Sequence, residues 1–433
     1  MRITLHGGKT PVSVRYMRWR FPMNDTLYGH GDGFLTQNGQ RLFPIGFYEH
    51  PAEDDALRDM AESGVNLVLC GSEESLDHAQ AHGMQGWVPL GLQSGATPEF
   101  QERIRTLAAH PALAVWEGPD EVVWGFTAYS GLWKQDQIGV FPNKGEWWMQ
   151  TPLAIEYSEG RAAEIMPKMR EAIEFIRSVD PHNRQIWINE ARDSDLKFVR
   201  QYIDFVDITG CDDYPIRPEG RPAIRLADST DRWRQVGKGR PVWMVLQGFT
   251  WNDLSDGDTD IIAFPSFAES RLMAYACIAH GARGILYWGS SYMKSDGKEA
   301  FRKSLYALTS ELAALQPFLT APIERYVTAR LIDDGRTDIP PPVSMRGVSA
   351  TARRIGRDWL IALVNEDEHA YLGVEVAGLG ALNGTEFVEL YGEEKTTVSE
   401  GSFSTRIRPF EVKLFATHRK WETDRREGRD FAD

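Results

Sequence analysis

Short apolar runs alternate with amphipathic stretches along most of the chain. Eight runs have the length and composition of strands, at Arg41–Phe47, Val65–Cys70, Met84–Leu90, Leu113–Glu117, Arg184–Asn189, Phe205–Gly210, Pro241–Gln247 and Arg283–Trp288. Stretches with helical spacing lie between or after them, near Asp54–Ser63, Glu73–His82, Pro98–Ala109, Glu159–Ser178, Ser194–Ile203, Ile224–Val236, Phe267–His280 and Glu299–Leu315. Apolar strands separated by helices are typical of a parallel sheet that is buried on both faces.

Eight such units over about 250 residues predict an α/β fold, specifically a TIM-type (β/α)₈ barrel. A doubly wound open sheet is the alternative. It is disfavoured because no Gly-rich phosphate-binding loop follows the first apolar run.

The two ends of the chain have a different pattern. Residues 1–40 predict an N-terminal β segment that packs on a barrel formed by residues 41–321. Apolar positions then alternate in short segments, at Tyr326–Leu331, Val348–Arg353, Trp359–Asn365, Tyr371–Val376, Glu386–Tyr391 and Phe410–Ala416. This alternation predicts a C-terminal β-sandwich over residues 322–418, followed by a charged, disordered tail at 419–433.

Composition narrows the classes of partner. A net charge of −14 argues against nucleic acid, because phosphates repel an acidic surface. No apolar run reaches the 18 residues of a membrane span, and the three cysteines are too far apart for a zinc motif or a disulfide framework. The start of the chain has no signal-peptide pattern, which predicts a cytoplasmic protein; a secreted chain trimmed of its leader would have the same pattern. A neutral ligand fits best, and the oligomeric state is not predicted.

The active site of such a barrel lies at the carboxyl ends of its strands, in the loops that follow them. Applied here, this rule selects Tyr48, Glu49, Asp120, Glu121, Glu190, Asp212, Asp213, Tyr214, Gln247, Trp251 and Trp288. Acids near helix starts are also common for structural reasons, since they complement the helix dipole. Glu121 is the strongest candidate because it follows a strand and a proline turn and precedes a long insertion.

That insertion, at about Val122–Tyr157, combines aromatic residues with Gly, Asn and Gln. It contains Trp124, Trp147 and Trp148, and the whole chain has 14 Trp. A long loop in a compact domain is usually functional. We therefore predict a wall of aromatic rings that stack on a sugar; packing as a small core over the barrel rim is the alternative.

Other chemistries lack their motifs. The ten histidines are scattered and no His-x-His follows the first strand, so no metal site and no cofactor are predicted. There is no Gly-x-Ser-x-Gly elbow, and none of the eight strands ends in a Schiff-base lysine. Carboxylates, amides and aromatic rings remain, and two carboxyl groups around a glycosidic bond are sufficient for its hydrolysis.

Three segments resemble clan A of the retaining glycoside hydrolases, which share a (β/α)₈ barrel. They are Trp116–Glu121 (WEGPDE), Val206–Pro215 (VDITGCDDYP) and Ala282–Trp288 (ARGILYW). At fold level the resemblance extends from about Leu42 to Ala416. It implies that Glu121 is the general acid/base, that Tyr214 lies in the site, and that Trp288 forms the floor of the sugar subsite.

One position departs from the clan. Its nucleophile is a Glu at the end of the seventh strand, and here that position holds Gln247. The candidates for the second catalytic carboxylate are Asp213, Asp212, Glu190 and Glu49, in falling order. The expected function is hydrolysis of O-glycosidic bonds in a neutral oligo- or polysaccharide.

Two alternatives stay open. The first is a non-catalytic carbohydrate-binding protein on a decayed hydrolase barrel, which the missing glutamate motivates. The second is a lyase or isomerase of sugar acids, for which Arg217 and Arg271 are the nearest candidates to bind a carboxylate.

Overall fold

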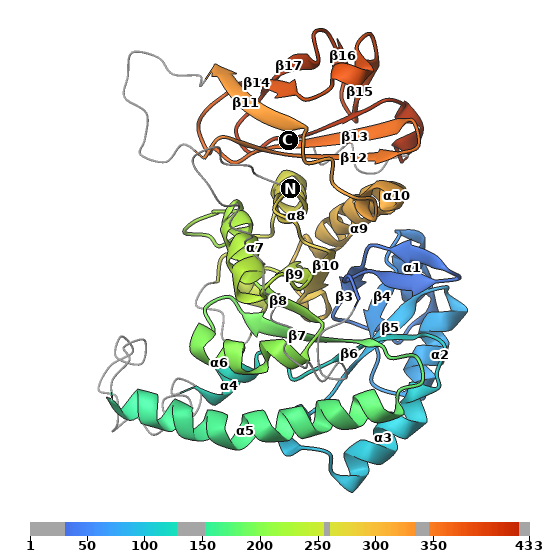
Figure 1. The fold of residues 1–433 in the computed structure, drawn as a ribbon, viewed down its shortest axis with the longest axis vertical. Coiled ribbons are helices and arrows are strands. Elements are labelled where there is room, and N and C mark those ends of the chain that lie inside the picture. Colours follow the sequence, from blue (N-terminus) through green and yellow to red (C-terminus); the bar gives the residue numbers. More distant parts are fainter. Residues whose placement is uncertain (1–30, 128–151, 255–259, 334–345, 424–433) are drawn as a thin grey trace, which may run out of the picture.

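Eight parallel strands close into a barrel in the computed structural model, which describes residues 31–127, 152–254, 260–333 and 346–423 (Figure 1). They are β3 (Ile45–Phe47), β4 (Leu67–Leu69), β5 (Gln85–Pro89), β6 (Leu113–Glu117), β7 (Gln185–Ala191), β8 (Ile208–Asp212), β9 (Val242–Gln247) and β10 (Gly284–Trp288). Each strand pairs with its neighbour in sequence, and β10 closes the ring against β3. The predicted (β/α)₈ fold is therefore confirmed.

Helices cover the barrel and follow its strands. They are α1 (Asp54–Glu62), α2 (Glu73–Ala81), α3 (Pro98–Ala108), α4 (Val122–Phe126), α5 (Pro152–Val179), α6 (Leu196–Tyr202), α7 (Arg225–Val236), α8 (Phe267–Ala279), α9 (Lys298–Ala314) and α10 (Gln316–Leu319). Short 3₁₀ turns occur at Leu92–Ser94, Ile203–Phe205, Trp251–Asp253, Ser290–Tyr292, Gly380–Leu382 and Arg419–Trp421. Capping side chains fix several helix starts: Ser72 and Ser266 each form a capping box, and Thr97 caps α3.

Two predicted strand starts differ from the observed ones by three residues or more, and the other strand boundaries by two at most. Arg41 belongs to the preceding hairpin, so the first barrel strand begins only at Ile45. The sixth begins at Ile208 because Ile203–Phe205 forms a 3₁₀ turn. This strand ends at Asp212, so Asp212 is the last residue of a barrel strand.

The N-terminal hairpin of β1 (Leu35–Gln37) and β2 (Gln40–Leu42) closes the amino-terminal end of the barrel. Leu35 packs in the barrel interior with a cluster that includes Trp87, Trp187 and Trp243. The indole N–H of Trp243 donates to the backbone carbonyl of Gly33 at 2.8 Å. Side chains inside the barrel and the hairpin below it therefore form one packed core.

The C-terminal part forms two antiparallel sheets, as predicted. One contains β11 (Thr328–Asp333), β14 (Leu372–Ala377) and β17 (Ser402–Ile407). The other contains β12 (Val348–Ile355), β13 (Asp358–Asn365), β15 (Glu386–Leu390), β16 (Lys395–Thr397) and β18 (Val412–Ala416). Their inner faces share an apolar core. Strands β16 and β17 were not predicted, although β17 alternates buried and exposed positions.

Helix α8 joins the barrel to these sheets. It packs against α7, α9 and β9 on the barrel side and against β12, β13 and β18 on the sheet side (Figure 1). Within the interface, Arg271 pairs with Glu311 at 2.9 Å and donates to the carbonyl of Val412 at 2.7 Å. Arg271 therefore holds the two parts together. No helix in the described part of the chain is long and apolar enough to cross a membrane.

Candidate active site

Four carboxyl groups gather at the carboxyl ends of two barrel strands. Glu117 is the last residue of β6, Asp120 and Glu121 lie in the turn that leads to α4, and Asp212 is the last residue of β8. We call these four residues the acidic cluster. Strand β7 pairs with both β6 and β8, so Asn189 on β7 lies between the two halves of the cluster.

Asn189 joins the two halves of the acidic cluster. Its side-chain N–H group donates to Asp120 Oδ1 at 2.9 Å and to Asp212 Oδ2 at 3.2 Å. The two carboxylate oxygens therefore lie no farther apart than the sum of these distances. Burial raises the pKa of Asp120 to about 6, the Asn189 bond lowers it in part, and the charge of Glu121 raises it further.

Glu121 and Asp212 form the closest pair of acids in the cluster. Their carboxyl groups are within hydrogen-bonding reach of each other, and Asp212 is buried. Burial, followed by the charge of Glu121, raises the pKa of Asp212 well above its ordinary value. Asp212 therefore favours its protonated form, because burial and a neighbouring acid both oppose a negative charge at this position.

The turn that carries Glu121 is held in an uncommon backbone conformation. Its φ angle is 48°, in the left-handed region that residues other than glycine rarely adopt. The Glu121 N–H donates to the carbonyl of Asn189 at 3.0 Å, and its own carbonyl accepts from Gly125 at 2.7 Å. Such strain persists only where the surroundings impose it, and it is concentrated at functional sites.

Glu117 belongs to the cluster although the sequence analysis did not select it. It is 1% exposed and accepts hydrogen bonds from the Tyr48 hydroxyl and the Trp87 indole, both at 2.8 Å. Burial and the neighbouring Asp120 raise the pKa of Glu117 to about 8, so it is mostly neutral at pH 7. Its position as the last residue of an apolar strand was the signal that could have identified it.

An aromatic platform lies beside the acids. Tyr214 and Trp288 stack with their ring centroids 5.3 Å apart and an interplanar angle of 19°, and Phe249 meets both rings edge-on. Tyr292, 54% exposed, extends the platform from the Trp288 side. Burial and the charges of Asp212 and other acids in the cluster raise the pKa of Tyr214, which places the platform next to the acidic cluster.

Two of the predicted catalytic acids have structural partners. Arg225 Nε donates to Asp213 Oδ1 at 2.9 Å, and the Ser229 hydroxyl donates to Asp213 Oδ2 at 2.7 Å. Both partners come from α7 and its first turn, so Asp213 fixes that helix to the end of β8. This leaves Asp213 poorly suited to attack a substrate.

Glu190 is likewise enclosed. It accepts from the backbone N–H of Val123 at 3.1 Å, the Ser194 hydroxyl at 2.7 Å and the Tyr202 hydroxyl at 3.0 Å. Burial raises its pKa to about 8. Glu190 is fully buried, and its partners belong to α4, α6 and the loop before α6. The arrangement indicates that it supports the turn after Glu121 from below.

Gln247, the last residue of β9, also bonds to the backbone. Its Oε1 accepts from the N–H of Ile216 at 2.9 Å, and its Nε2 donates to the carbonyls of Ile216 and Phe249 at 2.9 and 3.1 Å. All three recorded hydrogen bonds of this buried amide are to main-chain groups. Gln247 therefore positions the loop after β8 and presents no group to a ligand.

The remaining candidates lie around the cluster or outside the described residues. Burial raises the pKa of the half-buried Glu49. Trp251 lies under the guanidinium of Arg217, 3.4 Å from the ring centroid, and Trp124 is half-buried on α4. Trp147 and Trp148 fall in residues 128–151, outside the described part.

Other tryptophans are core residues: Trp87, Trp116, Trp187, Trp233 and Trp243 are fully buried, which accounts for part of the high Trp content.

Comparisons with known proteins give fold-level likeness alone. No family model matches the chain, and no curated protein matches it. Among solved structures, a catalytic mutant of Gan42B, a GH42 beta-galactosidase from G. stearothermophilus, covers 90% of this chain and 99% of its own at 11% identity, with a TM-score of 0.50.

Two further solved structures score lower. A GH30 endoxylanase from Clostridium papyrosolvens has 12% identity and a TM-score of 0.42, covering 87% of this chain and 96% of its own. A beta-galactosidase from the psychrophilic Marinomonas ef1 has 14% identity, covers 63% of this chain and has a TM-score of 0.42; this chain spans about 60% of that protein's length. The likeness to the GH42 beta-galactosidase is thus one of fold alone.

Proposed function

We propose that the protein is a glycoside hydrolase that cleaves O-glycosidic bonds of a neutral carbohydrate, with Glu121 as general acid/base and Asp212 as the second carboxylate. The observation that carries the proposal is the hydrogen-bonded pair of Glu121, in the loop after β6, and Asp212, at the carboxyl end of β8. On sequence grounds Asp213 ranked first and Asp212 second among the candidates for this carboxylate. Because Asp213 is held by Arg225 and Ser229, Asp212 now ranks first.

The pair can supply both groups that hydrolysis requires. In the free protein we place one proton on the buried Asp212, where burial disfavours the charged form. When a sugar binds, the proton passes to Glu121 across their hydrogen bond and then to the glycosidic oxygen, as the bond between that oxygen and the anomeric carbon breaks. Asp212 becomes a carboxylate in the same step and attacks the anomeric carbon. Water then releases the sugar, with Glu121 taking its proton.

The closeness of the two groups favours retention of configuration. Inverting enzymes hold their carboxyl groups about 6.5–9.5 Å apart to admit a water, whereas retaining enzymes hold them about 5–5.5 Å apart. Two carboxyl groups within hydrogen-bonding reach leave no room for an intervening water. We therefore expect the product to keep the anomeric configuration of the substrate.

Neighbouring residues match the needs of a sugar ligand. The Tyr214–Trp288 platform offers a flat apolar surface, on which the C–H face of a pyranose ring can stack. Asp120 and Asn189 offer a carboxylate and an amide carbonyl that can accept hydrogen bonds from sugar hydroxyls. The Asn189 Oδ1 atom is buried and has no hydrogen-bond partner among the described residues, so it is free to accept one.

Turnover on a panel of neutral oligosaccharides and aryl glycosides tests the proposal. We expect Glu121→Gln and Asp212→Asn each to lower kcat by about 10³-fold or more on any glycoside the protein cleaves, since each removes an acid–base group. Glu174→Gln, on the outer face of α5, is the matched control and should leave kcat unchanged. Nuclear magnetic resonance of the first-formed product reads the anomeric configuration. Undiminished turnover in Glu121→Gln would refute the assignment.

The second candidate function is non-catalytic carbohydrate binding. It is favoured by Gln247, whose amide occupies the end of β9 and faces only backbone groups. This reading predicts binding of an oligosaccharide by calorimetry with no product after prolonged incubation. Detectable turnover that depends on Glu121 excludes it. The lyase or isomerase reading is weaker, because Arg271 is used in the interface ion pair with Glu311.

A further inference from the structure

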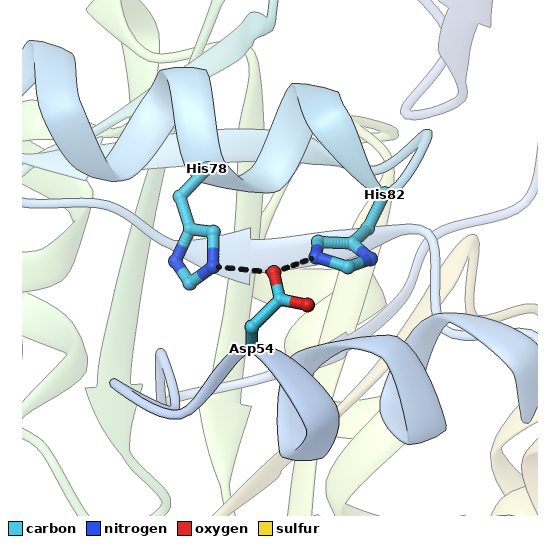
Figure 2. Close-up of side chains that lie close together, drawn as sticks. All are labelled: Asp54, His78 and His82. Carbon is cyan, nitrogen blue, oxygen red and sulfur yellow. Dashed lines mark hydrogen bonds and ion pairs between the residues drawn. The ribbon is translucent and has the colours of Figure 1, made fainter.

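Three side chains that can bind a metal ion converge on the flank of the barrel, and none of them belongs to the acidic cluster. Figure 2 shows the imidazoles of His78 and His82 directed toward one carboxylate oxygen of Asp54. His82 Nε2 lies 2.7 Å and His78 Nε2 3.3 Å from Asp54 Oδ1. One ligand atom from each of the three residues lies within 4.8 Å of the others.

The positions of these residues explain the convergence. His78 lies in α2 and His82 directly follows it, four residues later, so both rings project from one side of the helix. Asp54 is the first residue of α1, on the neighbouring barrel unit. The His side chains are 28% and 13% exposed, so their rings are largely enclosed between the helices, whereas Asp54 is 64% exposed and leaves an entry path.

A fourth side chain supports the arrangement from outside. His50, in the loop between β3 and α1, places its Nε2 3.2 Å from His78 Nδ1. The His50 Nδ1 in turn lies 3.8 Å from Cys70 Sγ. A hydrogen bond at the outer ring nitrogen of a histidine fixes which nitrogen faces a metal, and such outer bonds accompany most histidine metal sites. Here the other ring nitrogen of His78, Nε2, faces Asp54.

The spacing fits a small divalent ion. Metal bonds of about 2.0–2.1 Å in a tetrahedral site place neighbouring ligand atoms about 3.3 Å apart. The His78–Asp54 separation already has this value, and the His82–Asp54 separation of 2.7 Å needs to open by about 0.6 Å. A cationic neighbour, Arg58, reaches within 4.0 Å of the other Asp54 oxygen, but it is closer to Asp55, at 2.5 Å.

We propose that Asp54, His78 and His82 form a binding site for a borderline divalent metal ion of the zinc class, completed by water. Imidazole nitrogens suit Zn²⁺, Co²⁺ and Ni²⁺, whereas Mg²⁺ and Ca²⁺ prefer oxygen ligands. The bound ion would link α1 to α2 and so stabilise two consecutive units of the barrel. The site is independent of the proposed glycoside hydrolysis.

Calorimetric titration of the full chain, metal-depleted and without any polyhistidine tag, tests the proposal with Zn²⁺ as the probe. We expect one Zn²⁺ per chain with a Kd of about 1 µM or tighter, and no heat from Mg²⁺. Excess Zn²⁺ should raise the melting temperature by about 2–4 °C. His78→Ala and His82→Ala should each weaken binding at least 100-fold, and His182→Gln, at an exposed histidine elsewhere, should not change it.

Two further measurements keep the proposal falsifiable if a variant fails to fold. Co²⁺ bound to the unaltered chain should give visible absorption bands of a nitrogen- and oxygen-ligated ion, which Zn²⁺ abolishes by competition. His50→Phe should weaken Zn²⁺ binding by about 10–100-fold while the melting temperature in a chelator stays unchanged, as expected of a positioning residue. Absence of Zn²⁺ binding by the unaltered chain, or binding undiminished in both His78→Ala and His82→Ala, would overturn the proposal.

Discussion

Glu190 gives the most direct test of how burial controls the acids of this barrel. It is fully buried in β7, and burial raises its pKa from 4.5 to about 8 despite three hydrogen bonds to the carboxyl group. Glutamine can replace it without losing these bonds: Oε1 still accepts from Val123 and Tyr202, and Nε2 donates to the Ser194 hydroxyl. The substitution therefore removes the titrating proton and little else.

The sign of the effect follows from proton linkage. Between pH 4.5 and about 8 the folded state holds a proton on Glu190 that the unfolded state has released. The free energy of unfolding therefore falls by about 1.4 kcal/mol for each pH unit in this window. Below pH 4.5 Glu190 makes its full contribution to the free energy of unfolding. This contribution is smaller by about 3 kcal/mol at pH 7, and by about 4–5 kcal/mol once the pH passes 8. Glu190→Gln removes this dependence.

Urea unfolding at pH 5, 6, 7 and 8, followed by tryptophan fluorescence, measures the difference. Most tryptophans lie in the barrel, so the signal reports its transition. We expect the variant and the original protein to be similar at pH 5, and the variant to be more stable by about 3 kcal/mol at pH 7. Glu174→Gln, an exposed control, should show no such trend. A difference that is constant with pH, or that shrinks as pH rises, would refute the reasoning.

Three other substitutions test separate parts of the molecule. Gln247→Glu should lower the free energy of unfolding by about 3 kcal/mol or more and should not raise kcat, because a carboxylate would face the Ile216 carbonyl; chemical denaturation and initial rates measure the two effects. Trp288→Ala should raise KM about tenfold with a smaller effect on kcat, as read from initial rates on a cleaved glycoside. Arg271→Met should cost about 3–5 kcal/mol by removing the cation that faces the buried Glu311, and the double change with Glu311→Leu should recover most of it in thermal unfolding.

The barrel could be predicted because its strands are apolar on both faces. Runs such as Val242–Gln247 are buried at every position, and no other common fold repeats such runs eight times between helices. The boundaries of the strands were harder to predict from the sequence. The apolar residues Ile203 and Phe205 belong to a 3₁₀ turn that packs under the barrel, and periodicity does not separate such a turn from a strand.

The site could be predicted in part, for a related reason. The rule that active sites follow barrel strands selected Asp120, Glu121 and Asp212, which the structure brings together. It missed Glu117 and Asn189, which lie within strands and point at the site from below. Which acids are held by partners, as Asp213 is by Arg225, depends on helix placement that a linear pattern does not encode.

The convergence of Asp54, His78 and His82 could likewise be predicted from the sequence only in part. The spacing of His78 and His82 was visible in the sequence, since four residues separate them within a predicted helix. Their partner Asp54 comes from a different helix, so the convergence depends on how α1 and α2 pack. A pair of histidines one turn apart on a helix is thus a signal to examine even where no His-x-His motif is present.

The role of Gln247 follows from what its amide holds. It bonds to both backbone groups of Ile216 and to the Phe249 carbonyl, so the segment after β8 is fixed against the end of β9. That segment begins next to Asp212, which is one acid of the proposed pair. It carries Tyr214, which is one ring of the aromatic platform. The seventh-strand position therefore supports the groups around the pair and does not join it. A barrel built in this way can draw its two carboxyl groups from the loop after the fourth strand and from the end of the sixth.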